Sequence, residues 1–428
     1  RGVDLDAGLR AIASGLAEEV SVPQLAEDLN GLLMRFGDGH ASVSAGRVRE
    51  TEHLPCLLQE AGEGVVAFLP DRSGFVDPKR PFVQAIDGRS IEEWIEAARP
   101  LVSSGSEALV RHRTLRLMRE IQRVRRAAGD EPAAGAEVVL SSRSKGGSKK
   151  TRTLKLSGRR PTYGPWPRGK TRLLEGRAAS GLKGGVGVLR LAEMDDELVP
   201  ELREAMTRFR NTAGLIVDVR GNGGGRRGLL EALAGYLAND GPVVGNCAAY
   251  RLAPGFDRDH LGGARLLYRA DDERWSDEQS QAIARFAESF EPEWKLPDGF
   301  SEWHYLVLDR TGHRAEYAYT KPVVVLIDAG CFSATDIFAA AMGELPGVTL
   351  LGETTSGGSA RVQSFELPST GIRVRCASMA SFQPNGRLYD GNGVSPDIEV
   401  SSDPADLLRG DSDAQLAAAV KLIAKRTR

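Results

Sequence analysis

Ser333 stands at a point of the chain where a serine could act as a nucleophile. It follows the apolar run 321–328, typical of a buried strand, and precedes the helical pattern 335–342. A side chain on such a turn projects from a sheet edge, and the next amide, that of Ala334, points toward any oxyanion that forms there. A serine at a helix start is also a common N-cap, and Asp336 would complete a capping box. This stretch alone favours the capping role.

A glycine-rich loop follows another apolar run. The run 214–220 is nearly continuous and leads into Gly-Asn-Gly-Gly-Gly at 221–225. Consecutive glycines let the backbone present amides, here those of Gly224 and Gly225, to an anion because no side chain blocks the approach. The anion could be a phosphate or a tetrahedral oxyanion, but the glycine order is not that of a dinucleotide loop and no Walker lysine follows. A plain glycine-rich turn is the alternative.

The elements that must position these two turns indicate an α/β core over 185–428. Continuous apolar runs are typical of strands buried on both faces, and here they alternate with amphipathic helices. The predicted strands cover 186–191, 214–220, 321–328, 348–352, 364–367, 372–378 and 398–400. The predicted helices cover 198–209, 228–237 and 335–342. Residues 251–320 form an insertion in this core, with a helix predicted at 277–290.

The chain before the core divides into three predicted parts. Residues 1–53 form a helical segment, because leucines repeat there at helix spacing. Residues 54–158 form a β-rich module of short strands, one helix at 91–98 and a closing hairpin, an outline that resembles a PDZ domain. The basic stretch 142–150 is expected to be a solvated hairpin tip. Residues 159–184, rich in Pro, Gly, Arg and Lys, are expected to be a linker.

Composition narrows the classes of function. A chain of 428 residues suggests two or three domains. Its net charge of −2 points to neither a nucleic acid nor an anionic membrane as a partner, and it has no apolar run long enough to span a bilayer. The four cysteines lie far apart and no H-E-x-x-H pair occurs, so neither a disulfide framework nor a zinc site is expected.

Four short motifs occur in order between residues 186 and 400. They are Asp-x-Arg-x-Asn-x-Gly-Gly, Ser-Ala-x-Asp, Gly-Glu-x-Thr and Gly-Val-x-Pro-Asp-x-x-Val. The matching residues are Asp218, Arg220, Asn222, Gly224 and Gly225; Ser333, Ala334 and Asp336; Gly352, Glu353 and Thr355; and Gly393, Val394, Pro396, Asp397 and Val400. This order resembles the peptidase family of the C-terminal processing (tail-specific) proteases, the tricorn core and the retinoid-binding repeats of photoreceptor matrix. The resemblance implies a crotonase-like α/β peptidase core, no metal and no organic cofactor.

The sequence differs from the larger branch of this family at the position of the residue that serves as the base. Processing proteases of the Ser/Lys type carry a lysine in a loop after Gly-Glu-x-Thr, and Gly358 occupies that position here. No lysine lies between Lys321 and Lys421. A Ser–Lys dyad is therefore excluded on this alignment.

The tricorn-like branch uses a histidine from the N-terminal region and an acid near the last motif. The stretch around His40 resembles its Asp-Gly-His-Thr sequence, and Asp390 stands where the family usually has Glu. The resemblance implies that His40 takes the Ser333 proton and that Asp390 orients the imidazole. His40 could instead be a turn histidine and Asp390 a turn residue. The fallback bases are His304, His53, His112, His260 and His313.

The resemblance implies hydrolysis of peptide bonds through an acyl-enzyme. The Gly224 amide, with Gly225, and the Ala334 amide would bind the oxyanion, and an unfolded protein or peptide would be the substrate. A non-catalytic binding protein on the same fold is the alternative, in which Ser333 is a helix cap. An esterase is disfavoured because no Gly-x-Ser-x-Gly elbow occurs in a suitable context. Many bacterial relatives work outside the cytoplasm, so export is expected; nothing in the sequence indicates an oligomeric state.

Overall fold

The described residues of the computed structural model form two units. They are residues 3–16, 19–45, 50–130, 137–167, 169–179, 181–252, 262–310 and 315–427. Unit 1 comprises Arg1–Pro165, Val362–Ala377 and Ser401–Ala414; unit 2 comprises Trp166–Arg361, Ser378–Val400 and Gln415–Arg428. Each unit therefore combines segments that are far apart in the sequence.

A six-stranded sheet forms the centre of unit 2. Its strand order is β19-β15-β14-β10-β9-β8, with all neighbours parallel except β8, which is antiparallel to β9. The strands are Ile398–Glu399 (β19), Val348–Gly352 (β15), Val323–Ile327 (β14), Gly214–Asp218 (β10), Val186–Arg190 (β9) and Arg172–Leu174 (β8). The predicted α/β class is confirmed, and β8 lies inside the range that was predicted to be a linker.

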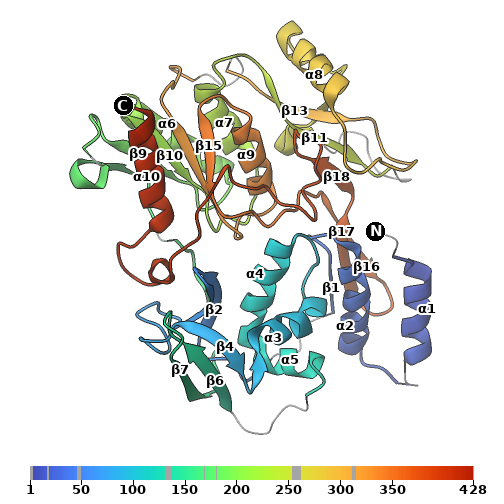
Figure 1. The fold of residues 1–428 in the computed structure, drawn as a ribbon. Helices are drawn as coiled ribbons and strands as arrows, with labels where there is room; N and C mark the ends of the chain where they lie inside the picture. Colours follow the sequence, from blue (N-terminus) through green and yellow to red (C-terminus); the bar gives the residue numbers. More distant parts are fainter. Residues whose placement is uncertain are drawn as a thin grey trace. The chain divides into compact units, whose positions relative to one another are not determined.

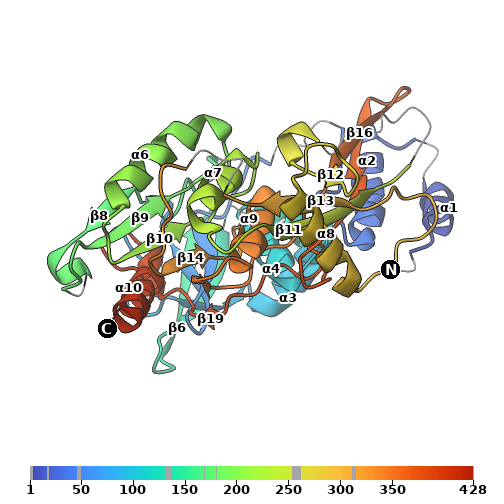
Figure 2. The same cartoon turned by 90° about the horizontal axis from the view of Figure 1, so that it is seen from above.

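Both faces of this sheet are buried. Leu215 and Val217 of β10 pack into one hydrophobic cluster, while Ile216 between them packs into another. Figure 2 shows helices on the two sides of these strands. One cluster contains residues of α6 (Val199–Phe209), α7 (Gly228–Leu237) and α9 (Ala334–Gly343), and the other contains residues of α10 (Ala414–Arg426). Double burial explains why the strands appear in the sequence as continuous apolar runs.

A second sheet of unit 2 includes part of the insertion 251–320. Its order is β12-β13-β11-β18, and α8 (Asp277–Ser289) packs against it. The strands are Tyr268–Arg269 (β12), His304–Leu308 (β13), Val243–Tyr250 (β11) and Met379–Phe382 (β18). The helix at 277–290 is confirmed, and the aromatic residues of the insertion, Trp275 and Trp303 among them, pack beneath it.

Unit 1 contains a five-strand path with a short sixth strand beside it. The order is β2-β3-β4-β6-β7, with β5 paired to β4. The strands are Leu57–Ala61 (β2), Gly64–Phe68 (β3), Phe82–Ile86 (β4), Arg89–Ser90 (β5), Glu137–Arg143 (β6) and Lys149–Lys155 (β7). The helices are α3 (Ile91–Ala98), α4 (Glu107–Leu117) and α5 (Ile121–Ala127). Only α3 was predicted, because the arginines interleaved in α4 and α5 hide their apolar spacing.

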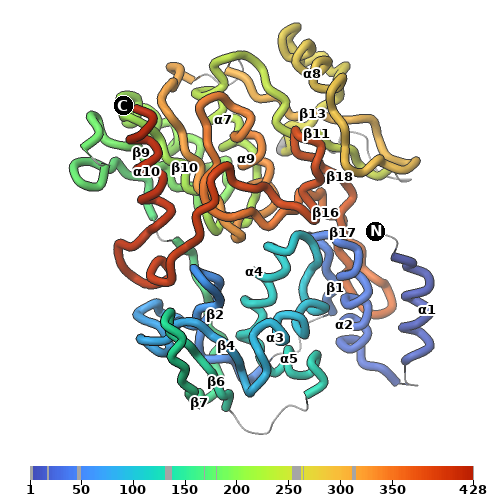
Figure 3. The backbone as a smooth tube through the Cα atoms, in the orientation of Figure 1, coloured from blue at the N-terminus to red at the C-terminus, as the bar shows by residue number. Residues whose placement is uncertain are grey.

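The N-terminal helices of unit 1 lie beside a strand pair from late in the chain. Helices α1 (Leu5–Gly15) and α2 (Val22–Leu33) confirm the predicted helical segment, and Ser21 caps α2. Strand β1 (Ser42–Ser44) pairs with β17 (Ile372–Ala377), which pairs with β16 (Val362–Leu367). Figures 1 and 3 show this sheet of blue and orange-red segments. The strands at 364–367 and 372–378 were predicted as part of the 185–428 core, but in the structure they belong to unit 1 and pair with β1.

None of the helices that the structure describes is both long enough and apolar enough to cross a membrane.

Candidate active site

Ser333 lies in a strained turn between β14 and α9. Its backbone φ is +62° and its ψ is −118°, a conformation that costs a residue with a side chain about 1–3 kcal/mol. Ser333 directly precedes α9, yet its side chain makes no capping hydrogen bond to that helix. The capping-box alternative for Ser333 and Asp336 is therefore wrong. Backbone strain at a residue whose side chain does not cap the helix that follows is typical of a functional position.

Two other segments hold this turn in place. The Phe332 amide donates a hydrogen bond to the Asn222 carbonyl at 3.1 Å. The Ser356 amide donates to the Cys331 carbonyl at 2.9 Å. The glycine-rich loop and the loop after β15 therefore both bind the residues that precede Ser333.

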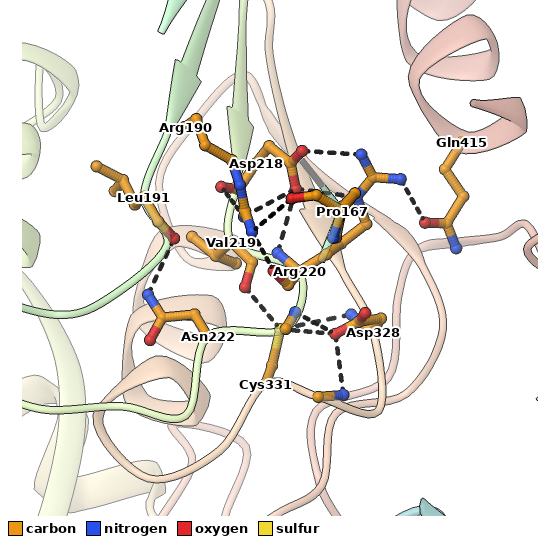
Figure 4. Close-up of polar contacts among 12 residues, drawn as sticks. Pro167, Arg190, Leu191, Asp218, Val219, Arg220, Asn222, Asp328, Cys331 and Gln415 are labelled. Atoms are coloured by element: carbon orange, nitrogen blue, oxygen red, sulfur yellow. Dashed lines mark hydrogen bonds and ion pairs between the residues drawn. The ribbon is translucent and has the colours of Figure 1, made fainter. Parts of the chain in front are cut away.

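A buried ion-pair network lies under the glycine-rich loop (Figure 4). Asp218, at the end of β10, accepts hydrogen bonds from the Arg220 side chain at 2.8 and 2.9 Å, and Arg190 pairs with the same carboxylate at 3.4 Å. Arg220 also donates to the Gln415 side chain at 3.0 Å. Burial alone would raise the pKa of Asp218, but the two arginines hold it below its usual value. The first two residues of the first motif therefore support the loop rather than react.

The glycines of this loop approach Ser333 too closely for a side chain. A Cβ on Gly224, whose φ is +101°, would lie 2.8 Å from the Ser333 Cβ and 3.0 Å from the Ala334 nitrogen. A Cβ on Gly225, whose φ is +143°, would overlap the Met194 carbonyl. The structure thus brings Gly224, Ser333 and Ala334 together, with Gly225 next along the loop.

The side chain of Asn222 organises the amides of the loop. Its Nδ2 donates to the Leu191 carbonyl at 3.0 Å, and its Oδ1 accepts a hydrogen bond from the Gly224 amide at 2.9 Å. In this conformation the Gly224 amide is engaged by the protein. An oxyanion would therefore share or replace the Asn222 oxygen as the acceptor of the Gly224 N–H.

Asp336 is a fully buried acid one helical turn after Ser333. Its Oδ1 accepts hydrogen bonds from the Thr355 hydroxyl at 2.5 Å and from the Gly357 amide at 2.9 Å. Burial raises its pKa to about 7, against the opposing effect of these hydrogen bonds, and the charge of Asp390 raises it further. The sequence placed Asp336 in a motif but gave no signal that it is a buried acid.

Thr355 joins the second motif to the last one. Its hydroxyl, which donates to Asp336, accepts a hydrogen bond from the Val394 amide at 2.8 Å, and its own amide donates to the Val394 carbonyl at 3.0 Å. Asp397 accepts from the Leu350 amide at 2.8 Å, which ties the end of the last motif to β15. The four motifs are therefore successive parts of one hydrogen-bonded scaffold around Ser333.

Asp390 lies in the loop after β18, next to the buried Tyr389. The Tyr389 carbonyl accepts from the Gly393 amide at 3.0 Å and closes this loop. Because the charge of Asp390 acts on Asp336, the two carboxyl groups lie within electrostatic range. Asp390 is thus near the start of α9, on the same unit as Ser333.

His40 belongs to unit 1, in a loop held by its neighbours. Asp38 accepts hydrogen bonds from the His40 amide at 2.8 Å and from the Ala377 amide of β17 at 2.6 Å. The Gly39 carbonyl accepts from the Arg113 guanidinium at 2.7 Å. The role of Asp38 in fixing this loop was not foreseen from the sequence. The pairing of His40 with Ser333 stays a prediction.

The fallback histidines differ in their suitability as bases. Desolvation lowers the pKa of His112 to about 3, so that it would bind a proton too weakly. Desolvation also lowers the pKa of His304, whose ring lies 5.4 Å from that of Tyr250 on the second sheet of unit 2. His53 is buried in unit 1, while His260 and His313 lie outside the described residues.

Gly358, which stands where the Ser/Lys branch carries its lysine, packs against the Phe332 ring. A Cβ there would overlap the Phe332 ring and lie 2.9 Å from its Cζ. A side chain at this position would require the Phe332 ring to rotate away.

Asp336→Asn is expected to raise the melting temperature relative to the wild type by an amount that grows as the pH rises from about 4 to about 7. The folded-state pKa of Asp336, about 7, lies above its ordinary value of 3.8. The stability contributed by the protonated carboxyl is therefore complete below pH 3.8 and is lost as the pH rises through the folded-state pKa. Asparagine keeps an accepting oxygen for Thr355 and Gly357 and never ionises. Since each kcal/mol moves the melting temperature of such a unit by roughly 2–4 °C, the variant should gain several degrees at about pH 8.

Thermal melts of the wild type and the variant across this pH range measure the difference. Asp240→Asn, at an exposed acid of unit 2, is the control and should show no such trend. A constant difference between Asp336→Asn and the wild type at all pH values would contradict the assigned titration.

Known proteins share this fold. A model described as Peptidase family S41 matches residues 185–400, just over half of the chain. The crystal structure of mature CPAF is similar at 16% identity with a TM-score of 0.67, covering 100% of this chain and 91% of that one. Mature CPAF complexed with lactacystin gives 16% identity, a TM-score of 0.65 and coverage of 100% and 92%. The photosystem II D1 C-terminal processing protease gives 17% identity, a TM-score of 0.44 and coverage of 94% and 87%. The two CPAF similarities establish a shared fold, and the family match contains Ser333.

Proposed function

The chain belongs to peptidase family S41, whose members are serine peptidases, and from that membership we propose that Ser333 is the nucleophile that hydrolyses peptide bonds. The observation that carries this assignment is the backbone of Ser333. It is strained at φ +62°, it does not cap α9, and it faces a glycine that cannot bear a side chain. A serine kept in such a position at an energetic cost is suited to chemistry rather than to structure.

The first step is attack of the Ser333 hydroxyl on the substrate carbonyl. His40 takes the hydroxyl proton and returns it to the leaving amine, and Asp390 stabilises the imidazolium cation. Water then attacks the acyl-enzyme, again with His40 as base, and releases Ser333. Ser–Lys chemistry is not proposed, because Gly358 stands where that branch carries its lysine and no lysine lies between Lys321 and Lys421.

The oxyanion would bind to the Ala334 amide at the start of α9 and to an amide of the glycine-rich loop. Gly224 lies against Ser333, and its N–H points at the Asn222 oxygen, an acceptor that an oxyanion could replace. Gly225 is the second candidate on this loop. Loss of one such donor typically raises the barrier by roughly 3–4 kcal/mol.

The finer architecture is part of the same proposal. The parallel sheet of unit 2 with helices on both faces is consistent with a crotonase-like peptidase core. The sheet of residues 54–158 in unit 1, with α3 beside it, is consistent with a PDZ-like module that adds an extended peptide as a strand. An unfolded protein or a chain terminus is the substrate that fits such a module.

Covalent labelling tests the nucleophile directly. A fluorophosphonate should phosphonylate Ser333, and peptide mapping by mass spectrometry should find the adduct on the tryptic fragment that contains it. Labelling of no serine, together with no cleavage of denatured casein, would favour the non-catalytic binding protein instead.

A further inference from the structure

Two arginines of unit 2 lie next to each other, Arg227 buried and Arg265 partly buried. Arg227, at the start of α7, is only 4% exposed, and its Nη1 donates to the Arg265 carbonyl at 2.6 Å. Arg265 donates its own Nη1 to the Ala360 carbonyl at 3.3 Å. Arg361, the next residue along the chain from Ala360, acts electrostatically on Arg265. The guanidinium groups thus gather around the end of the loop that follows β15.

No carboxylate compensates these charges among the residues that the structure describes. Desolvation lowers the pKa of Arg227 to about 9, and the neighbouring charge of Arg265 contributes in the same direction. Desolvation and the charge of Arg361 likewise lower the pKa of Arg265. The contrast with Arg190 and Arg220 is informative, because those buried arginines share the Asp218 carboxylate. Burying a cation that has no carboxylate partner among the described residues is costly, so its retention needs a reason.

A buried hydroxyl without a partner lies beside this pair. Tyr389 is 0% exposed, and its hydroxyl has no hydrogen-bond partner among the described residues. The pKa of Tyr389 is raised strongly by burial and lowered in part by Arg227, which places the phenol near that guanidinium. A guanidinium has five N–H donors, and Arg227 uses one of them within the described part of the chain. A cluster with more hydrogen-bond donors than acceptors is typical of a site that binds an anion.

Both segments that hold Ser333 lead to this cluster. Arg227 comes directly after the glycine-rich loop, three residues beyond Gly224, which lies against the Ser333 turn. Arg265 is bonded to Ala360, at the end of the loop whose Ser356 is bonded to Cys331. A peptide that reaches Ser333 would therefore have the arginines close to its path.

We propose that Arg227 and Arg265 form a subsite that receives a carboxylate of the peptide substrate. The inference rests on the proposed function, since it assigns a preference to the same active site. One guanidinium can bind a carboxylate through two parallel hydrogen bonds, and a second nearby adds charge; both sources of a carboxylate occur in peptides. One is the side chain of Asp or Glu, and the other is the free C-terminus.

The test compares matched peptides on the intact protein. One series carries Asp or Asn at each position around the scissile bond, and another carries a free or an amidated C-terminus. The wild type should cleave the peptide with the relevant carboxylate with a kcat/KM higher by roughly tenfold to a hundredfold, the factor that one charge-assisted hydrogen bond provides. The series that shows the difference identifies the source of the carboxylate.

Variants of the two arginines then assign the preference to this subsite. Arg265→Gln should bring the two peptides of a pair close to equal kcat/KM, and Arg265→Glu should invert the preference toward a Lys-containing peptide. Arg285→Gln, at an exposed arginine of α8, is the control and should keep the preference. An unchanged preference in Arg265→Gln and Arg265→Glu would overturn the proposal.

Fluorophosphonate labelling separates this proposal from the assignment of the nucleophile. The reagent has no carboxylate, so Ser333 should react at the wild-type rate in Arg265→Gln. If Ser333 is labelled but the wild type does not prefer acidic peptides, the subsite alone is refuted. If Ser333 is not labelled, the assignment of the nucleophile is refuted.

Stability gives a further criterion for Arg227. Replacing an arginine kept for structure would destabilise the protein, whereas replacing a buried arginine with no carboxylate partner in the described part of the chain should not. Arg227→Met is expected to melt at or above the wild-type temperature while losing the preference for the carboxylate peptide. A lower melting temperature with the preference intact would show a structural role and would contradict the proposal.

Discussion

Ser333→Ala is expected to abolish peptide hydrolysis, with kcat lower by roughly a million-fold, the scale seen when the nucleophile of a serine peptidase is removed. The methyl group cannot form the acyl-enzyme, so only binding and oxyanion stabilisation remain. Initial rates on a fluorogenic peptide, with active protein counted by titration, measure the change. KM should change little, because the hydroxyl contributes its energy in the transition state.

The stability of the same variant distinguishes the nucleophile from a helix cap. Loss of a capping serine typically costs about 1 kcal/mol, but Ser333 makes no capping hydrogen bond to α9. Ser333→Ala should therefore melt close to the wild-type temperature, since alanine bears the same strain at positive φ. Ser289→Ala, on the exposed helix α8, is the matched control and should keep full activity. Residual hydrolysis by Ser333→Ala near the wild-type rate would rule out Ser333 as the nucleophile.

His40→Ala is expected to lower kcat by roughly 10⁴-fold to 10⁶-fold, because a serine hydroxyl is a weak nucleophile without a base. No lysine is available at the Gly358 position to replace it. Labelling of Ser333 by the fluorophosphonate should slow in parallel, since that reaction also needs proton removal.

His304→Gln serves as the comparison for this prediction. Desolvation lowers the pKa of His304, and its Nδ1 lies 2.9 Å from the Glu302 carbonyl, just before β13. This variant should keep most of the activity. The reverse pattern, an active His40→Ala and an inactive His304→Gln, would move the base from unit 1 to the insertion.

The peptidase motifs could be recognised from the sequence because each is local. A buried parallel strand must be a continuous apolar run, so β10 and β14 were predicted within a few residues of their observed ends. Glycines with positive φ, such as Gly224 and Gly225, stand where no side chain fits, so they too appear as a sequence pattern.

Other features were missed because they depend on what packs around a residue. In helix α4, arginines are interleaved with the apolar residues. The apolar residues of α4 therefore showed only a weak helical periodicity in the sequence. The pairing of β1 with β17 joins residues more than 300 positions apart, which no local pattern encodes. The range 159–184 resembled a linker by composition, yet its short strand β8 completes the edge of the core sheet.

For Ser333, the sequence by itself determined the strand, the turn, the helix and the order of the four motifs around them. Only the tertiary structure decided that this serine is strained and does not cap its helix, and that Phe332 fills the space at Gly358. It also decided that Asp336 is a buried acid and that Arg227 is a buried cation without a carboxylate in the described part of unit 2. The physical reason is that hydrophobic spacing and backbone conformation are properties of neighbouring residues. The desolvation of a charge is set by distant segments that the fold brings to it.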